Sequence, residues 1–313
     1  MSNWKVLITD GLSDKGISIL SSAAQVDNKP DIAADDLLKI AGDYDAMVVR
    51  GRTKVTPVVF DAAVKLKAVG RAGVGVDNID LTAARSHGVT VVNAPISTSL
   101  AVAELAIGLM FSLARMIPKA DTTMKQGQWI KKQLEGIELN GKILGIVGMG
   151  NIGTALASRT AGLGMKVIGY DSLVPAEEIK KRGAQPVSAT DLYARSDFIS
   201  FHLPLTPESK GMVNGQVLAQ MKRGVRLVDA ARGGIMDETA LLAALETGQV
   251  AAAALDVFAT EPPGLTALVA HPNVVATPHI GAQTEEAQDR AAEDIASEVL
   301  NVLRGETLRW KIV

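Results

Sequence analysis

The stretch Lys142–Gly153, KILGIVGMGNIG, decides the fold of this 313-residue chain. Its first half is an apolar run typical of a strand, and Gly148, Gly150 and Gly153 have the G-x-G-x-x-G spacing directly before a helix-like segment. Such glycines permit a tight turn, a close approach of backbone N–H groups to a pyrophosphate, and close contact of helix and sheet. The stretch therefore predicts a dinucleotide-binding βαβ unit; the alternative is a plain glycine turn between a strand and a helix.

Strand-like and helix-like runs alternate on both sides of this stretch. Downstream, the apolar runs KVIGY, DFISF, VRLVD, VAAAALDVF and NVVAT are separated mostly by helical patterns, which gives six parallel strands together with KILGIV. Upstream, KVLIT, AMVVR, KAVGR and VTVVN repeat the same rhythm. The expected fold class is therefore α/β, with two Rossmann-like or flavodoxin-like domains that each contain a parallel sheet, and with the active-site cleft between them.

The expected domain boundaries lie where this rhythm is interrupted. Residues 1–96 are expected to form the first part of a substrate-binding domain, because the rhythm pauses near Asn93-Ala94-Pro95. Residues 97–283 are expected to form the dinucleotide-binding Rossmann domain. Residues 284–313 are expected to form a C-terminal helix that returns to the substrate-binding domain, which is then discontinuous in sequence.

The longest apolar run, Leu100–Ile117, almost reaches the length of a membrane span, but it contains Glu104, Ser112 and Arg115. We therefore expect a buried or interface helix. The N-terminal segment has neither the long apolar run nor the cleavage site of a signal peptide, so a cytoplasmic location is expected.

The net charge argues against two classes of partner, and the lack of cysteine excludes several kinds of chemistry. The formal net charge is −2 without a long run of one sign, which argues against nucleic acid or a membrane surface as a partner. The absence of cysteine excludes disulfides, thiolate chemistry and a cysteine-based zinc site, and no metal is expected.

Asp171 follows the second strand of the dinucleotide-binding series, about 20 residues after the glycines, where an acid binds the ribose hydroxyls. A carboxylate there would repel a 2′-phosphate, and the first arginine after it is Arg182. The position therefore predicts NAD as the cofactor in place of NADP. The alternative is a surface aspartate that caps a turn.

Three further segments carry a resemblance to a known family. They are VDAARGGIMDETALLAAL with Arg232, ALDVFATEPP with Glu261, and HPNVVATPHIGAQT with His279. Together with the glycine motif and GRAGVGVDNID, they resemble the D-isomer-specific 2-hydroxyacid dehydrogenases, and most of all the members that oxidise 3-phosphoglycerate. The resemblance covers nearly the whole chain.

The resemblance implies catalytic roles for Arg232, Glu261 and His279. The histidine takes the hydroxyl proton while a hydride passes to the nicotinamide. This agrees with the chemistry of the residues, since imidazole titrates near neutrality and a carboxylate partner orients it and raises its pKa. The planar donors of Arg232 suit a carboxylate and a keto oxygen. The alternative for His279 is a hydrogen-bonded structural histidine.

The resemblance also implies contacts with the cofactor and with the substrate. The cofactor contacts fall on Val74, Gly148, Gly150, Asn151, Ile152, Gly153, Asp171, Leu203, Pro204, Ala230, Arg232, Asp256, His279, Gly281 and Ala282. The substrate contacts fall on Arg50, Arg71, Val74, Gly75, Arg232 and His279. Many members of the family have Thr at the position of Val74, which has no side-chain hydroxyl.

Three arginines, Arg50, Arg52 and Arg71, end strand-like runs of the first domain, where the ends of strands in open α/β sheets face the ligand. Members that act on a phosphorylated acid have arginines matching Arg50 and Arg71 near the phosphate. The alternative is that one or more are surface residues or form structural ion pairs, and Arg52 is the first candidate for that role.

The function that these features predict is NAD-dependent oxidation of a D-2-hydroxy acid, namely 3-phosphoglycerate to 3-phosphohydroxypyruvate in L-serine biosynthesis. A hydroxypyruvate or glyoxylate reductase is an alternative, and an NAD(H)-sensing, corepressor-like binding protein is an alternative of another class. The Leu100 helix and the arm through Trp129 match the dimer-forming region of the family, so a homodimer through the NAD-binding domain is expected.

Overall fold

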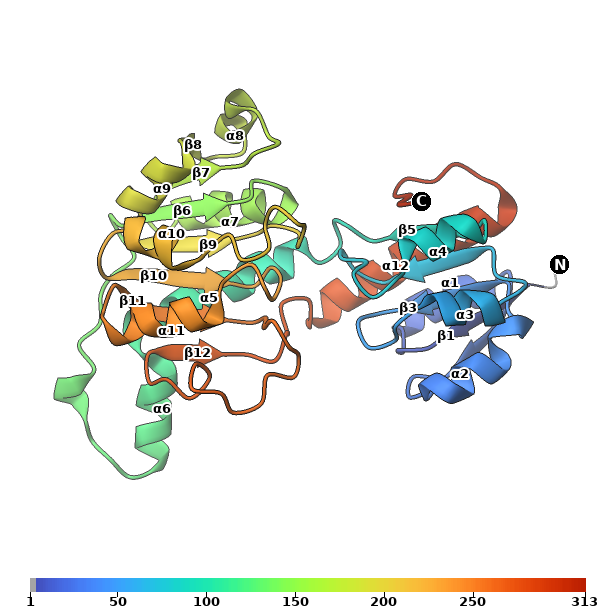
Figure 1. Ribbon diagram of the computed structural model, residues 1–313, viewed down its shortest axis with the longest axis horizontal. Coiled ribbons are helices and arrows are strands. Elements are labelled where there is room, and N and C mark those ends of the chain that lie inside the picture. Colours follow the sequence, from blue (N-terminus) through green and yellow to red (C-terminus); the bar gives the residue numbers. More distant parts are fainter. Residues whose placement is uncertain (1–3) are drawn as a thin grey trace. The chain divides into compact units, whose positions relative to one another are not determined.

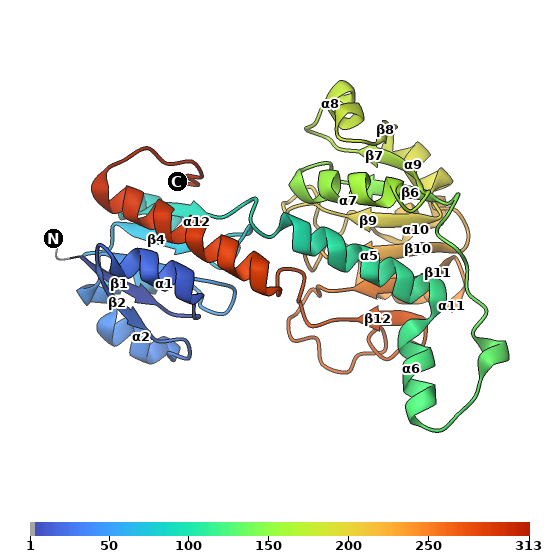
Figure 2. The same ribbon diagram turned by 180° about the vertical axis from the view of Figure 1, so that it is seen from behind.

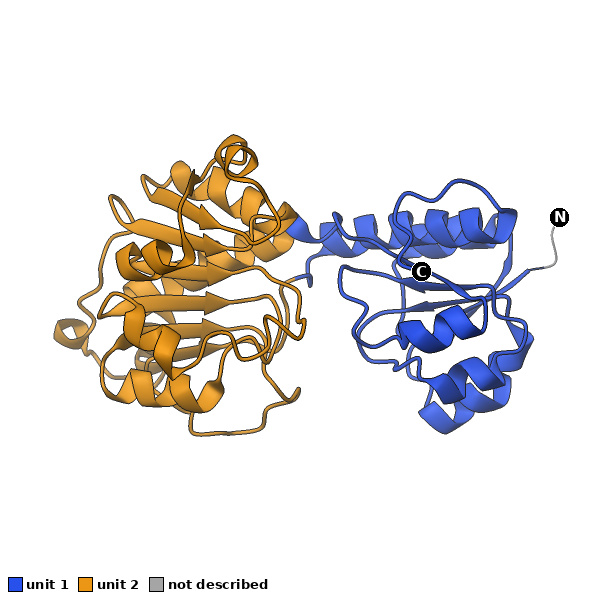
Figure 3. Cartoon of the chain, turned by 45° about the horizontal axis from the view of Figure 1, so that its top comes forward, with its two compact units in different colours: residues 1–99, 282–313 blue, residues 100–281 orange. Residues whose placement is uncertain are grey.

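The computed structural model describes residues 4–313, and the chain divides into two compact units (Figure 3). Unit 1 comprises Met1–Ser99 and Ala282–Val313, and unit 2 comprises Leu100–Gly281. The sequence pattern predicts the first boundary after residue 96 and the second after residue 283.

The sheet of unit 1 is parallel, with the strand order β2-β1-β3-β4-β5 that is typical of flavodoxin-like folds. Its strands are β1 (Lys5–Ile8), β2 (Gln25–Asn28), β3 (Ala46–Val49), β4 (Ala68–Arg71) and β5 (Thr90–Asn93). Its helices are α1 (Asp14–Ser21), α2 (Ala34–Ile40), η1 (Ala41–Asp43), α3 (Pro57–Ala62), α4 (Leu81–Ser86) and α12 (Glu285–Arg304). Helices α2 to α4 cover one face of the sheet and α1 and α12 the other (Figures 1 and 2).

The register of unit 1 brings two of the predicted site residues to one edge of the sheet. Arg71 pairs with Val49 at the carboxyl ends of β4 and β3, and Arg50 is the next residue after β3. Arg50 and Arg71 therefore leave the sheet at the same edge.

Helix α12 belongs to unit 1 because small residues let it lie directly on the sheet and on α1. A Cβ at Gly70 of β4 would come within 2.5 Å of Val299, and one at Gly16 of α1 would come within 2.8 Å of Ala292. The helix begins at its cap Thr284, whose hydroxyl accepts from the N–H of Ala287, and ends at Gly305 with a positive φ of 71°.

The sheet of unit 2 is also parallel, with the order β12-β11-β10-β9-β6-β7-β8. Its strands are β6 (Ile143–Val147), β7 (Lys166–Tyr170), β8 (Gln185–Pro186), β9 (Phe198–Phe201), β10 (Val225–Asp229), β11 (Val250–Leu255) and β12 (Val274–Ala276). Its helices are α5 (Ser99–Arg115), α6 (Ile117–Lys125), η2 (Lys131–Gln133), α7 (Asn151–Ala161), α8 (Ala176–Lys181), α9 (Ala189–Arg195), α10 (Gly215–Gln220) and α11 (Glu238–Glu246). Read from β8 to β11, this is the Rossmann order 3-2-1-4-5-6, and β12 adds a further strand.

The strands predicted from the sequence are all present in unit 2, and β8 is additional. With only two residues, one of them proline, it has too few side chains to produce a recognisable pattern. Helices α5 and α7 cover one face of the sheet (Figure 2), and α9, α10 and α11 cover the other (Figure 1). Each face has its own apolar core, formed around Ile146 and Phe198 on the first and around Ile199 and Leu227 on the second.

The apolar run predicted as a buried or interface helix forms α5 and the start of α6. The two helices bend by 66° at Met116, whose φ of 49° is left-handed. One side of α5 is buried against the sheet, with Ala103, Ala106 and Met110 fully covered. No single helix within residues 4–313 is long and apolar enough to cross a membrane; α5 and α6 reach that length only together.

Candidate active site

The glycine loop between β6 and α7 leaves an open place at the N-terminus of a helix. Gly148 has a φ of 97°, and a Cβ there would overlap the carbonyl oxygen of His202; a Cβ at Gly153 would overlap that of Gly148. At Gly150, by contrast, a Cβ would meet no atom within 4 Å. The first and third glycines are therefore required by the packing of the unit, and the second faces space that suits a pyrophosphate at the positive end of α7.

Asp171 ties the glycine loop to the loop after β7. Its Oδ2 accepts from the N–H of Met149 at 2.8 Å, and its Oδ1 accepts from the N–H groups of Leu173 at 2.8 Å and Val174 at 3.1 Å. Each carboxylate oxygen accepts two hydrogen bonds, so Oδ2 retains one place for a further donor, such as a ribose hydroxyl. The carboxylate is thus oriented before any ligand arrives.

Arg182 also reaches the glycine loop, although it lies well beyond Asp171 in sequence. Its Nη1 donates to the carbonyl of Met149 at 2.6 Å, and its Nε donates to Glu178 at 3.0 Å. Sequence spacing alone does not bring an arginine to this loop. Because Glu178 balances its charge, Arg182 adds little attraction for a 2′-phosphate.

His279 and Glu261 form a hydrogen-bonded pair in unit 2. Nδ1 of His279 lies 2.8 Å from Oε2 of Glu261, whose Oε1 accepts from the N–H of Phe258 at 3.1 Å. An ionised carboxylate only accepts hydrogen bonds, so Nδ1 carries the proton and Nε2 is the nitrogen that can exchange one. The His279 side chain is 47% exposed, which leaves it accessible to a substrate.

The loop that presents His279 is wrapped around one buried carboxylate, that of Asp256. Its Oδ1 accepts from the hydroxyl of Thr277 at 2.6 Å and the N–H of Ile280 at 2.8 Å, and its Oδ2 accepts from the N–H of Gly281 at 2.8 Å. The family resemblance implies a cofactor contact for Asp256 and no other role. The second role has no sequence signal, since it depends on backbone N–H groups that face a side chain from the neighbouring strand.

Arg232 lies in the turn after β10, next to the loop that carries Glu261. Its Nη1 donates to the carbonyl of Ala231 at 2.6 Å, and a Cβ at the following Gly233 would overlap the carbonyl of Phe258, so the two loops are in contact. Beneath the turn, Asp229 accepts from the N–H of Ala231 at 2.9 Å. Burial raises the pKa of Asp229 to about 7.

Arg232, Glu261 and His279 therefore follow β10, β11 and β12, three adjacent parallel strands of unit 2. The carboxyl ends of such strands form the ligand-binding edge of open α/β sheets. Other predicted cofactor positions follow strands of this sheet too: Asn151 and Ile152 begin α7, Leu203 and Pro204 follow β9, and Ala230 follows β10.

The remaining predicted residues, apart from Ala282 before α12, lie at the carboxyl end of β4 or in the segments that follow β3 and β4 in unit 1. The carbonyl of Val74 accepts from the side-chain amide of the buried Asn93 at 2.6 Å, and this hydrogen bond holds the loop that contains Gly75 in place. The guanidinium of Arg71 lies against Gly73. Arg52 donates to the carbonyls of Thr9, Pro30 and Ile32 and pairs with Asp10. Arg52 is thus a structural residue.

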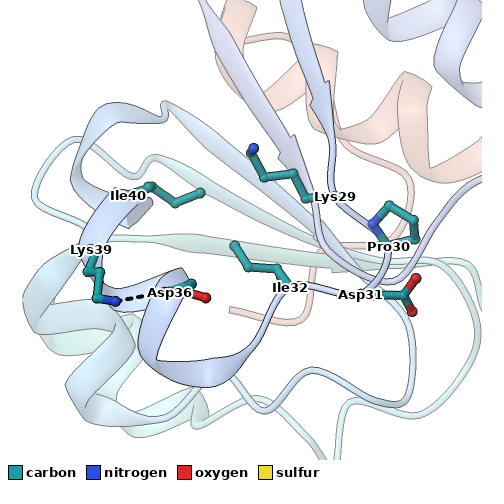
Figure 4. A pocket seen from close by; sticks show the side chains of 7 residues that line it. All are labelled: Lys29, Pro30, Asp31, Ile32, Asp36, Lys39 and Ile40. Atoms are coloured by element: carbon teal, nitrogen blue, oxygen red, sulfur yellow. Dashed lines mark hydrogen bonds and ion pairs between the residues drawn. The ribbon is translucent and has the colours of Figure 1, made fainter.

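Three surface pockets are lined by none of the predicted catalytic, cofactor-binding or substrate-binding residues. The first, about 530 Å³, is in unit 1 and is lined by Lys29, Pro30, Asp31, Ile32, Asp36, Lys39 and Ile40. Lys39 and Asp36 form an ion pair along α2 on one side of it (Figure 4). The other two, about 470 and 500 Å³, adjoin α5 and α6 in unit 2. Over the described part of the chain, no group of three or more histidine and acidic side chains could hold a metal ion.

Residues 107–281 match the family model of the D-isomer specific 2-hydroxyacid dehydrogenase, NAD binding domain, which is more than half of the chain. The chain belongs to this family, its fold class is that of the family, and its cofactor is NAD.

Individual relatives and solved structures are similar to almost the whole chain. The D-3-phosphoglycerate dehydrogenase of Rattus norvegicus is 47% identical over 97% of this chain, and that of Methanocaldococcus jannaschii is 46% identical over 96%. The chain spans 57% and 58% of the length of these two relatives. A glyoxylate reductase from Paecilomyes thermophila has a similar structure, with a TM-score of 0.89 and 31% identity over 100% of this chain and 99% of that one.

Proposed function

We propose that this protein is an NAD-dependent D-2-hydroxyacid dehydrogenase whose substrate is 3-phosphoglycerate, which it oxidises to 3-phosphohydroxypyruvate as a step of L-serine biosynthesis. The observation that carries the proposal is the His279–Glu261 pair at 2.8 Å, on the strand edge that also bears Arg232. The phosphoglycerate dehydrogenases among the relatives support the substrate.

In the proposed reaction, Arg232 holds the carboxylate and the reacting oxygen of the substrate through its guanidinium donors. Nε2 of His279 takes the proton of the 2-hydroxyl group, and Glu261 stabilises the imidazolium that forms. Bound NAD supplies the acceptor for the hydride from the same carbon. The products are then the 2-keto acid, NADH and a protonated His279, which returns its proton in the reverse reaction.

The residues of unit 2 fit the cofactor that the family uses. We propose that Gly148, Gly150 and Gly153 with the first turn of α7 hold the pyrophosphate, and that Asp171 accepts from a ribose hydroxyl. The open space at Gly150 and the place left on Oδ2 of Asp171 support this assignment. Ala230, Asp256, Gly281 and the other positions named from the resemblance remain proposed contacts.

For the substrate, we propose that Arg50 and Arg71 bind the phosphate and that the backbone of Val74 and Gly75 binds the carboxylate. A phosphate dianion needs several charged donors to offset the hydration that it loses. Arg50 is well suited, because its guanidinium has no ion pair within residues 4–313.

Initial rates of NADH formation with hydroxy acids, and of NADH consumption with keto acids, test the proposal. The protein should oxidise 3-phosphoglycerate with NAD and prefer NAD to NADP, and it should reduce hydroxypyruvate and glyoxylate more slowly than 3-phosphohydroxypyruvate. Faster reduction of the two unphosphorylated acids would favour the reductase alternative, for which the structural likeness to a glyoxylate reductase is the specific support. Tight NADH binding without turnover of any of these acids would favour the NAD(H)-sensing alternative.

We further propose that the protein is a homodimer formed through unit 2. On α5, α6 and the arm that follows, Phe111, Ile117, Met124 and Trp129 are exposed by 37%, 49%, 56% and 77%. Large apolar side chains gathered on adjacent elements are typical of a protein interface.

A further inference from the structure

The side chain of Arg50 has an uncharged partner. Its Nη2 donates to Oε1 of Gln283 at 3.0 Å, across 233 positions of sequence and within unit 1. No carboxylate of the described residues lies within ion-pair distance of it, and burial lowers the pKa of the guanidinium. The Asp10 carboxylate offsets this lowering in part, but it does not form an ion pair with the guanidinium. A partly desolvated cation without an ion-pair partner is suited to bind an anion.

The neighbouring acid, Asp10, is occupied by other donors. Its carboxylate accepts from the N–H of Arg50 at 2.7 Å, from the N–H and hydroxyl of Thr53, and pairs with Arg52 at 3.3 Å. Asn78 in turn donates to the carbonyls of Arg50 and Thr53. The backbone of Arg50 is therefore fixed on both sides, while most of its side-chain donors remain available.

The orientation of the Gln283 amide follows from the chemistry of its partner. Arginine only donates hydrogen bonds, so the oxygen of the amide faces Arg50 and the NH₂ group faces away. Gln283 is exposed, and its NH₂ group has no acceptor among residues 4–313. The amide can thus hold the guanidinium in place and donate to the same anion.

We propose that Gln283 is a specificity-determining residue for the phosphate of the substrate: its oxygen positions Arg50, and its NH₂ group donates to a phosphate oxygen. The inference rests on the proposed function. A glutamate at this place would neutralise Arg50 and repel the phosphate, whereas the amide orients Arg50 without cancelling its charge.

The experiment compares kcat/KM for D-3-phosphoglycerate and D-glycerate, with NAD at saturation, in the wild type, Gln283→Glu and Gln283→Ala. Gln283→Glu should lower the value for the phosphorylated acid by roughly 10² or more, because a charge-assisted contact becomes a repulsion, and Gln283→Ala by about 5- to 10-fold. The value for glycerate should change by less than about threefold in either variant. Thermal unfolding checks folding; if Gln283→Glu does not fold, the Gln283→Ala result decides.

Gln25→Glu is the matched control. Gln25 is exposed at the amino end of β2, whereas Arg50 follows the carboxyl end of β3, so the two residues lie at opposite ends of the parallel strands. The same change of charge at Gln25 should therefore leave the preference for the phosphorylated acid unaltered. A wild type that prefers glycerate, or oxidises neither acid, would contradict the proposed function. A wild type that prefers the phosphorylated acid, together with Gln283 variants that keep this preference or lose both activities equally, would overturn the role of Gln283 alone.

Discussion

At the scale of single residues, the conformation of His279 decides where its imidazole lies. Its φ of 54° is left-handed, a region that residues other than glycine adopt infrequently, although histidine does so more often than most. The hydrogen bonds of Asp256 to Thr277, Ile280 and Gly281 hold the backbone in that region. Asp256 is therefore a positioning residue for His279.

Replacing His279 by Ala should lower kcat by roughly 10² to 10⁴, the usual loss for a general acid-base, while NADH binding is largely retained. Asp256→Ala should also lower kcat, because the loop relaxes and the imidazole moves. If Asp256 acts through His279, the kcat of the double variant should lie within about twofold of the kcat of His279→Ala. Steady-state kinetics measure this, with His271→Ala, a histidine in the loop before β12, as the control. If the kcat of the double variant falls by the product of the two single losses, the positioning role is contradicted.

His202 makes stability depend on pH. Its Nε2 bonds with Ser200 at 2.8 Å, its Nδ1 is buried without a hydrogen-bond partner in the described structure, and burial lowers its pKa to about 4. The ordinary value is near 6.5, so between pH 6.5 and 4 the unfolded chain binds more protons at this residue than the folded chain.

The contribution of His202 to stability is therefore complete above pH 6.5 and is lost as the pH falls toward 4. Between pH 7.5 and 5, it should account for about 1–2 kcal/mol of the decrease in the free energy of unfolding. Urea titrations of the wild type and His202→Gln at both pH values measure the difference. An equal decrease in both proteins would show that His202 is not the group responsible.

At the scale of secondary-structure elements, the sequence predicts those features that depend on local pattern. The β6–glycine loop–α7 unit is predictable because spacing, strand and helix lie within one short stretch. Most of the alternating strands are predictable because each is an apolar run of several residues. The exceptions are β2, whose sequence QVDN has one apolar residue, and β8, which has two residues in all. The sequence pattern does not predict the end of α5 either, since the apolar run continues through Met116, whose φ is left-handed.

The contacts that prepare the candidate site are the part that the sequence does not reveal. Arg182 reaches the glycine loop, Asp256 anchors the loop of His279, and Gln283 meets Arg50, in each case because the fold brings distant segments together. None of these residues lies at a characteristic spacing from its partner. Residue identities thus indicate the chemistry, and the tertiary structure is needed to find what positions it.

The C-terminal segment depends on a buried glutamate of α12. Glu298 is fully buried and accepts from the N–H groups of Arg309 and Trp310 at 2.9 and 3.1 Å, and Lys311 then forms an antiparallel bridge with Val92 of β5. The same carboxylate pairs with the Arg309 side chain at 3.3 Å. One carboxylate therefore joins α12 to the C-terminal segment that pairs with the edge strand β5.

Glu298→Ala should lower the free energy of unfolding by about 1–3 kcal/mol, because two N–H groups lose their acceptor. Amide exchange of residues 310–313 should become faster at the same time. The control is Glu293→Ala on the same helix, which removes only an exposed pair with Lys15 and should change stability by less than about 0.5 kcal/mol. Equal effects of both variants would contradict the role of Glu298 in holding the C-terminal segment.

At the scale of the whole molecule, the chain combines two parallel-sheet units, of which unit 2 contains most of the residues proposed to bind NAD and the His279–Glu261 pair. Unit 1 contains Arg50 and its partner Gln283. The division separates the residues proposed for chemistry from those proposed for phosphate recognition. Substitutions in unit 1 should therefore change substrate preference more than they change cofactor use.

The proposed dimer can be tested by light scattering after size-exclusion chromatography. The wild type should have twice the chain mass of 32.8 kDa, and Ile117→Glu should have the chain mass, because it places a charge among the exposed apolar side chains of α5 and α6. Glu is well accepted at the first position of a helix, so folding should be preserved. Val64→Glu, an 80% exposed apolar residue of unit 1, is the control. A wild type of 32.8 kDa at micromolar concentration would contradict the dimer.

The most direct test of the proposed function is the ratio of kcat/KM for D-3-phosphoglycerate to that for D-glycerate in the wild type and in Arg50→Ala, with NAD at saturation. The wild type should prefer the phosphorylated acid by roughly 10² or more, since charge-assisted contacts to a dianion are lost with glycerate. Arg50→Ala should remove most of that preference by raising KM for 3-phosphoglycerate, with little change for glycerate. A wild type that prefers glycerate, or an Arg50→Ala variant that slows both substrates equally, would contradict the account.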